Sequence, residues 1–248
     1  MLSTLESIMK SSRRDDCEII IVDDISTDRI DDIGTIYPEL NIKLFRFEEK
    51  FWRLPVYGYN LAFAKAEGDI IAITNPEAYH VGDVISHVLD NIKDDNYLVY
   101  SSYSIDPFYT GLLALSGNPA VIKYYDVPFD GYVERGWQQH TKHRTWDFHW
   151  FTAIKKHQLD KLSGFNEEYI HGYSFCDTEF IDRVKILGLN IERFDDPHVL
   201  HQSHGMPQLN YDPDIYKINY NLYHNSKKEI YSQNSFITGN DIKYKQII

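Results

Sequence analysis

Cysteine is scarce in this chain of 248 residues. The two cysteines, Cys17 and Cys176, lie far apart in the sequence and match no metal-ligand spacing. The sequence therefore supports neither a disulfide framework nor a cysteine zinc site, and reducing surroundings fit it best.

Long apolar runs are missing as well. No stretch approaches the roughly 18 to 20 apolar residues that span a bilayer, and the N-terminus lacks the apolar run of a signal peptide. We therefore expect a cytoplasmic protein without a transmembrane segment, unless the chain is truncated and has lost its targeting information.

Basic residues are outnumbered by acidic ones. Lys and Arg total 25 against 37 Asp and Glu, which gives a formal net charge of -12. Proteins that bind duplex nucleic acid neutralise phosphates with clustered cations, and no basic stripe is visible here. This argues against a nucleic-acid partner, and it implies that any bound phosphate needs a local cation.

The sequence does contain buried-strand patterns that end in polar side chains. The apolar run at 18–22 ends in Asp23 and Asp24, and a similar run at 69–74 ends in Asn75 and, after one proline, Glu77. In open α/β sheets, ligands bind at the carboxyl ends of such strands. We therefore expect these side chains to meet at one edge of a sheet.

The remaining pattern predicts one large α/β domain. Helical spacing occurs at 1–12, 56–66, 81–92, 177–187 and 216–226, and further strands are expected at 42–47, 97–103, 191–194 and 199–200. The segment 106–144 is the least periodic part of the chain. We expect it to be irregular and exposed to solvent, where acceptor-binding loops tend to lie.

Four stretches carry the chemistry at the ends of these elements. They are EIIIVDDISTD at 18–28, YNLAFAKAEGD at 59–69 running into ITNPE at 73–77, KLSGFNEE at 161–168 with GYSFCDTEF at 172–180, and VLHQSH at 199–204. In this order they resemble the inverting family-two glycosyltransferases and their galactosyltransferase-like relatives, over about residues 1–204. The resemblance implies the GT-A fold, a Rossmann-like α/β fold whose central sheet is mixed but mostly parallel and is flanked by helices.

The first stretch is similar to the turn that contacts the nucleoside of the donor in that family. The resemblance implies that Asp23, Asp24 and Ser26 bind a nucleoside-diphosphate sugar, with a UDP-sugar favoured, and Asn60 is a further donor contact. A carboxylate there can accept hydrogen bonds from a uracil or a ribose, and Ser26 can cap the next helix. An Asp pair after a strand also occurs in unrelated α/β proteins.

The second and fourth stretches resemble a metal site. Asn75 and Glu77 replace the aspartates of the family's DxD motif, and Mn²⁺ or Mg²⁺ accepts both amide and carboxylate oxygens. The alternative is a proline-led turn in which both residues cap the following helix. The fourth stretch is similar to the histidine that completes the metal site in several GT-A enzymes. It favours His201 over His204 as the ligand, and an imidazole ligand favours Mn²⁺.

The third stretch is similar to the region that holds the family's catalytic base. That role falls on Asp177, while Cys176 stands where the family has a glutamate. Inverting transfer needs a base on the face of the sugar opposite the leaving group, and a carboxylate at a helix start is fixed for that task. Asp177 can alternatively serve as a helix cap. Cys176, Glu179 and Tyr173 are candidate acceptor contacts.

An aromatic and cationic patch precedes the third stretch. Trp137 and Arg144 are candidate donor contacts, and Trp146 and His149 are candidate acceptor contacts, since such side chains stack on sugar rings and bind diphosphate. A packed loop explains the same residues equally well.

Together these patterns predict a metal-dependent inverting hexosyltransferase acting on a glycan, lipid or protein acceptor. Residues 1–204 are expected to form the GT-A domain, with a nucleotide-sugar half at 1–103, an acceptor and catalytic half at 104–204, and a C-terminal extension at 205–248. The acidic groups at 23, 24, 77 and 177 and the imidazole at 201 must then face one cleft.

Two alternatives compete with the transferase. A catalytically decayed module of the same fold, binding a nucleotide-sugar or a carbohydrate, would explain the altered metal motif and Cys176. A nucleotidyltransferase is disfavoured, because no Gly-rich phosphate loop is visible near the N-terminus. Family members also begin with a strand before the first helix, whereas this chain starts at the helix. Either its start is truncated, or the nucleotide pocket is built without that strand.

Overall fold

The structure of the protein, a computed structural model, describes residues 1–28, 30–204, 212–226 and 242–248. Its described residues form two compact units. Unit 1 contains residues 1–14, 72–154 and 190–204, and unit 2 contains 15–28, 30–71, 155–189, 212–226 and 242–248. The predicted boundaries at 103 and 204 are a different division of the chain and stay predictions.

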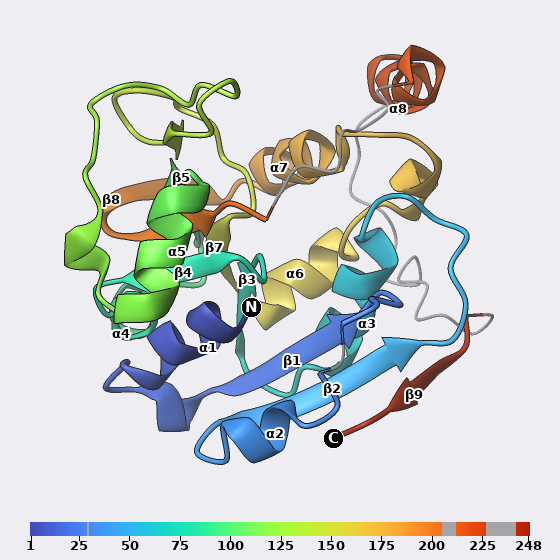
Figure 1. The fold of residues 1–248 in the computed structure, drawn as a ribbon. Coiled ribbons are helices and arrows are strands. Elements are labelled where there is room, and N and C mark those ends of the chain that lie inside the picture. The colour runs from blue at the N-terminus through green and yellow to red at the C-terminus, as the bar shows by residue number, and fades with distance from the viewer. Residues whose placement is uncertain (29, 205–211, 227–241) are drawn as a thin grey trace. The chain divides into compact units, whose positions relative to one another are not determined.

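A six-stranded sheet provides most of unit 1 (Figure 1). Its order is β3-β7-β5-β8-β4, and β6 pairs with β5. The strands are β3 (Ile70–Thr74), β4 (Ala78–Val81), β5 (Asn96–Ile105), β6 (Gly136–Gln139), β7 (Phe151–Lys155) and β8 (Asn190–Gln202).

The direction of these strands corrects the predicted sheet. β5 and β8 are parallel, whereas β4 is antiparallel to β8, and both β6 and β7 are antiparallel to β5. The sheet is mixed, and the expectation of a mostly parallel sheet was wrong. A strand that is buried on both faces shows the same apolar run whichever way its neighbour runs, so the pattern does not encode direction.

The helices of unit 1 are α1 (Leu2–Met9), α4 (Val84–Asn91) and α5 (Pro107–Ser116), with a 3₁₀ turn η2 (Pro119–Val121). Helix α5 lies in the segment predicted to be irregular. Its cap is Asp106, whose carboxylate accepts a hydrogen bond from the Tyr109 N–H at 3.0 Å. Leu113 is its buried residue, while Phe108 and Leu115 are exposed. The helix therefore lacks the amphipathic stripe by which sequence patterns are recognised.

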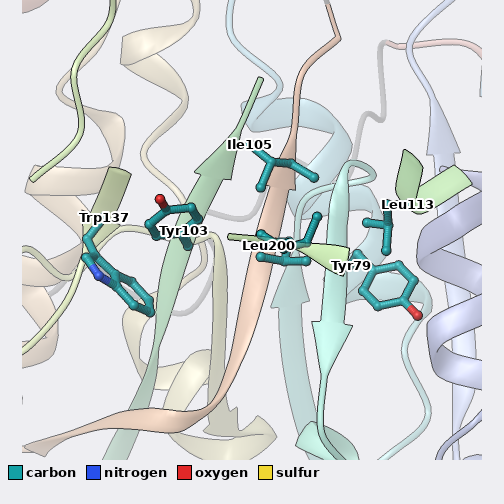
Figure 2. Close-up of a cluster of buried hydrophobic side chains, with 7 residues drawn as sticks. Tyr79, Tyr103, Ile105, Leu113, Trp137 and Leu200 are labelled. Atoms are coloured by element: carbon teal, nitrogen blue, oxygen red, sulfur yellow. The ribbon is translucent and has the colours of Figure 1, made fainter. Parts of the chain in front are cut away.

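Large side chains fill the core of unit 1 across four of its strands (Figure 2). Tyr79 of β4, Tyr103 of β5 and Leu200 of β8 lie in one cluster with Leu113 of α5 and Trp137 of β6. The parallel pairing of β5 and β8 sets Tyr103 opposite Leu200. This packing fixes the ends of β4, β5 and β8.

Unit 2 contains a separate three-stranded sheet (Figure 1). Strands β1 (Glu18–Asp23) and β2 (Asn41–Phe47), both expected as strands from their apolar runs, are parallel, and β9 (Tyr244–Gln246) pairs antiparallel with β2. The helices are α2 (Ile33–Ile36), α3 (Val56–Lys65), α6 (Lys156–Leu162), α7 (Cys176–Ile186) and α8 (Pro213–Asn225). Short 3₁₀ turns are η1 (Arg14–Asp16), which crosses between the units, and η3 (Glu167–His171).

Helix α7 matches the predicted helix at 177–187. Asp177 and Glu179 stand in its first turn and Arg183 in its last, which suits the helix dipole at both ends. The helix is followed by Gly188 with a left-handed φ of 83°.

Candidate active site

Glu77, His201 and His204 come together in unit 1. Antiparallel pairing of β4 with β8 sets Ala78 opposite His201, so the preceding Glu77 lies beside the end of β8. The His201 Nε2 is 3.2 Å from the Glu77 Oε1, and the His204 Nε2 is 4.0 Å from the same oxygen. One ligand atom from each of the three residues lies within 4.8 Å of the others.

The surroundings of this group suit a divalent cation. The Ser104 Oγ lies 3.4 Å from the His201 Nδ1, and the Trp150 ring packs edge-on against the imidazole at 4.5 Å. A hydroxyl can donate or accept, so Ser104 can hold the ring in either tautomer, including the one with a free Nε2 lone pair. A carboxylate and two imidazoles form a donor set that fits Mn²⁺.

Electrostatics keep Glu77 ionised in this position. Burial by itself would raise the pKa of Glu77, but the hydrogen bond and charge of His201 lower it below its ordinary value. A negative carboxylate beside two imidazoles is the form that binds a metal ion.

Asn75 belongs to the same turn. Its carbonyl accepts a hydrogen bond from the Ala78 N–H at 3.0 Å, and its own N–H donates to the Trp150 carbonyl at 3.4 Å. These bonds hold the backbone of the turn that carries Glu77. A ligand role for the Asn75 side chain stays a prediction.

Asp177 occupies the first turn of α7 in unit 2. Burial raises the pKa of its carboxyl to about 6, and the hydrogen bond from the Cys176 thiol at 3.7 Å opposes that rise. Burial also raises the pKa of the Cys176 thiol, which therefore stays protonated at neutral pH. A carboxylate with a pKa near 6 is ionised at neutral pH and is more basic than an ordinary aspartate.

The raised pKa predicts a stabilising effect of Asp177→Asn at neutral and alkaline pH. The pKa in the fold, about 6, exceeds the ordinary 3.8, so this group favours folding most below pH 4. That contribution is lost as the pH rises through 6. We expect Asp177→Asn to raise the unfolding temperature at pH 8, by about 2–4 °C for each kcal/mol relieved, and much less at pH 4. Thermal unfolding at both pH values measures this, and an equal shift at both would contradict it.

Asp23 and Asp24 follow β1 in unit 2, as predicted, but each is already hydrogen-bonded. The buried Asp23 accepts from the Ser26 N–H at 2.9 Å and from the Arg46 Nε at 2.5 Å. Asp24 accepts from the Trp52 Nε1 at 2.8 Å and pairs with a lysine, Lys50. Asp24 is the more accessible carboxylate of the two. Donor binding by Asp23, Asp24 and Ser26 stays a prediction, and Ser26 does not cap α2, which begins at Ile33.

The sequence profile of glycosyl transferase family 2 matches residues 1–176, which is more than half of the chain. The chain belongs to glycosyl transferase family 2. The match covers β1, the turn at 75–77 and the residues up to the start of α7, and Asp177 is the next residue.

Solved structures similar to this family 2 chain are GT-A glycosyltransferases. A mannosyltransferase from Pyrobaculum calidifontis, solved with GDP-Man and Mn²⁺, has a TM-score of 0.53 at 20% identity, covering 85% of this chain and 54% of its own. S. aureus TarS has a TM-score of 0.57 at 18% identity, covering 81% and 56%. GalNAc-T7 with UDP, GalNAc and Mn²⁺ has a TM-score of 0.60 at 12% identity, covering 90% and 45%.

These likenesses establish the fold. The chain spans about half the length of these three solved chains. No curated protein sequence matches it significantly. Among the described residues, no helix combines the length and the apolar character needed to cross a membrane.

Several predicted site residues of this family 2 chain are buried and hydrogen-bonded. Asn60 is fully buried. Its side-chain amide donates to the Phe165 carbonyl at 2.9 Å and accepts from the Phe165 N–H at 2.8 Å. His149 is buried against the Tyr97 hydroxyl at 2.9 Å, and Glu179 pairs with the buried Arg183 at 2.7 Å. These side chains contribute to packing, and their predicted ligand contacts stay untested.

The predicted aromatic patch divides into buried and exposed parts. Trp137 is 9% exposed and packs against Tyr103 in the core (Figure 2). Trp146 is 48% exposed, and the Arg144 guanidinium lies 4.4 Å from its ring centre. Tyr173, in unit 2, packs under the Arg53 guanidinium at 5.7 Å. Trp146 is therefore accessible to a ligand, whereas Arg144 is half-buried and donates a hydrogen bond to the Gln138 Oε1 at 3.1 Å.

Sequence reasoning missed Ser104 and Trp150, which contact His201. Ser104 stands opposite His201 in the parallel register of β5 and β8, and Trp150 lies just before β7. Neither residue belongs to a recognised motif. Strand pairing brings Ser104 to the histidine and ring packing brings Trp150, so local sequence carried no signal.

The two candidate groups lie in different units. Glu77, His201 and His204 belong to unit 1, whereas Asp23, Asp24 and Asp177 belong to unit 2. Their predicted convergence on one cleft stays a prediction.

Proposed function

We propose that this chain is a metal-dependent inverting glycosyltransferase that moves a sugar from a nucleoside-diphosphate sugar, of the uridine type, to a hydroxyl acceptor. The observation that carries the proposal is the meeting of Glu77 with His201 and His204, which are more than 120 residues away in sequence. In a family 2 chain, this group stands where the sequence resembles a metal motif.

Glu77, His201 and His204 would hold the cation, with Asn75 as a further oxygen donor. A divalent cation held there would offset the charge that develops on the departing diphosphate. Two similar solved structures support this choice, since one contains GDP-Man with Mn²⁺ and another contains UDP with Mn²⁺. Histidine ligands favour Mn²⁺ over Mg²⁺.

Asp177 would act as the base. It takes the proton of the acceptor hydroxyl while the acceptor oxygen bonds to the anomeric carbon, and the bond from that carbon to the diphosphate oxygen breaks. Attack opposite the leaving group inverts the configuration. The pKa of about 6 leaves Asp177 ionised at neutral pH and basic enough to assist this transfer.

The acceptor is proposed to be a glycan, lipid or protein hydroxyl. Unit 1 presents a broad open groove next to the start of α5, lined mainly by aromatic and apolar side chains together with Arg135, Asp106 and Asp130. Such a surface suits stacking on sugar rings. The groove lies in the segment that the sequence predicted to hold acceptor contacts.

Metal dependence gives the first test. We expect the protein to release free nucleotide slowly from UDP-sugars with Mn²⁺, to stop when the metal is chelated, and to resume when Mn²⁺ is restored. Magnesium should support less turnover. A coupled nucleotide-release assay measures this, and turnover that is unaffected by chelation would contradict the proposal.

The alternative is a binding module that has lost catalysis. It is favoured by Asn75 in place of a family aspartate and by Cys176 in place of a family glutamate. Such a module would bind a nucleotide-sugar, detected as a thermal shift with Mn²⁺, but would never release nucleotide from it. Thermal shift and release together separate the two functions.

A further inference from the structure

The loop that leads into Asp177 has an unusual backbone. Ser174 has a φ of 62° and Phe175 a φ of 69°, so two consecutive residues other than glycine adopt the left-handed region. Side chains disfavour that conformation, and it persists only where surrounding contacts impose it. Phe175 is the N-cap of α7 and lies two residues before Asp177.

Asn219 of α8 supplies such a contact. Its side chain is fully buried, and its Nδ2 donates to the Tyr169 carbonyl at 2.9 Å and to the Ser174 carbonyl at 3.0 Å. One amide group therefore bridges η3 and the residue that begins the left-handed pair. All of these residues belong to unit 2.

The contact is close as well as hydrogen-bonded. A Cβ placed on Gly172 would lie 2.4 Å from the Asn219 Oδ1 and 2.9 Å from the Asn219 backbone nitrogen. Because no side chain fits there, the glycine lets α8 approach the backbone of the loop. Gly172 and Asn219 are therefore complementary in shape.

Helix α8 also contacts the residues on either side of Asp177. The ring of Tyr223 stacks on Phe175 at 5.2 Å, and its hydroxyl donates to the Asp182 carboxylate at 2.6 Å. Both contacts join α8 to the start and the outer face of α7. They fix the direction in which α7 leaves the loop.

We propose that Asn219 is a positioning residue for Asp177, through which α8 sets the backbone that carries the base. The inference rests on the proposed function of Asp177. It makes a helix from the predicted C-terminal extension part of the catalytic apparatus. The matched part of the family profile ends at residue 176, before this helix.

The test compares Asn219→Ala with Asn221→Ala, the same change at an exposed position of α8. We expect Asn219→Ala to lower kcat by about 10-fold to 100-fold, since small misplacements of a reacting group cost that much. The KM for the donor and the affinity for Mn²⁺ should stay within about 2-fold, because, among the described residues, the Asn219 side chain is hydrogen-bonded neither to the Glu77 group nor to the predicted donor contacts Asp23 and Asp24. Asn221→Ala should behave as the wild type.

A pH profile separates positioning from loss of stability. Asp177 is half-buried, and looser packing exposes it further to water, so the acid limb of kcat should move below pH 6 in Asn219→Ala. Hydrogen exchange should quicken over 173–178 and stay unchanged in unit 1. Faster exchange with an unaltered kcat and acid limb would overturn the proposal and leave Asn219 a purely structural residue.

Two further measurements keep the inference independent of transfer activity. If the wild type transfers no sugar, the proposed function fails, and NMR titration of the Asp177 carboxyl still compares the two variants. A pKa that is the same in Asn219→Ala as in the wild type would overturn the inference. Gly172→Ala should also destabilise the wild type more than it destabilises Asn219→Ala, since the smaller side chain relieves the closest contact. Equal destabilisation would argue against the close contact between Gly172 and Asn219 as the origin of the effect.

Discussion

Asp177→Asn is expected to lower kcat for sugar transfer by about 10²–10⁴-fold, the range that a general base contributes. Asparagine keeps the shape of the side chain but cannot take a proton from the acceptor hydroxyl. Binding of Mn²⁺ and of the donor should persist, because Asp177 is neither a proposed metal ligand nor a proposed donor contact. Initial rates of transfer, with donor binding measured separately by calorimetry, check this result.

The same residue sets the expected pH dependence. Because the base works only when ionised and its pKa is about 6, kcat should rise with pH, be half-maximal near pH 6 and level off above neutral pH. Asp32→Asn, an exposed change in the same unit, is the matched control and should leave the profile unaltered. A normal transfer rate in Asp177→Asn, or a product with retained configuration, would contradict Asp177 as the base of an inverting reaction.

Glu77→Gln is expected to weaken Mn²⁺ binding by at least about 10–100-fold. Mutating a residue that only hydrogen-bonds to a metal ligand already costs that much, and Glu77 is proposed to bind the ion directly. Glutamine keeps the length of the side chain and an oxygen donor, but it loses the negative charge that lies beside both imidazoles. Nucleotide release should fall in parallel at limiting Mn²⁺ and recover in part at high Mn²⁺. Calorimetric titration with Mn²⁺ measures the affinity directly.

Glu6→Gln provides the control for that experiment, since Glu6 is exposed on α1 in the same unit. It should bind Mn²⁺ as the wild type does. An unchanged affinity in Glu77→Gln would show that the Glu77 group is not the metal site. His201→Ala would then distinguish a site held by histidine from no site at all.

Much of the fold could be predicted from local pattern. The apolar runs at 18–22 and 69–74 and the helix at 177–187 lie where the sequence placed them, because hydrophobic periodicity and helix ends are local properties. Strand direction could not be predicted, since β7 and β8 both pair with β5 but run in opposite directions, and their apolar residues do not specify which. Helix α5 was missed because Leu113 is its one buried residue, so its sequence shows no apolar stripe at helical spacing.

The candidate site was predicted in part, for a similar reason. Glu77, His201 and His204 carried a family likeness, and the structure does bring them together. Ser104, Trp150 and Asn219 carried none, because each reaches the site through pairing or packing with a distant segment. Asn60 shows the converse, since a residue within a likeness can be fully buried in the structure.

The sequence by itself determined the family, the acidic ends of the strands and the helix that carries Asp177, because these depend on short stretches of chain. Tertiary structure alone decided that Glu77 meets two histidines, that Asp177 has a raised pKa and that α8 holds the loop before it. Those properties depend on distance and desolvation between residues far apart in the chain, and neither is set by local sequence.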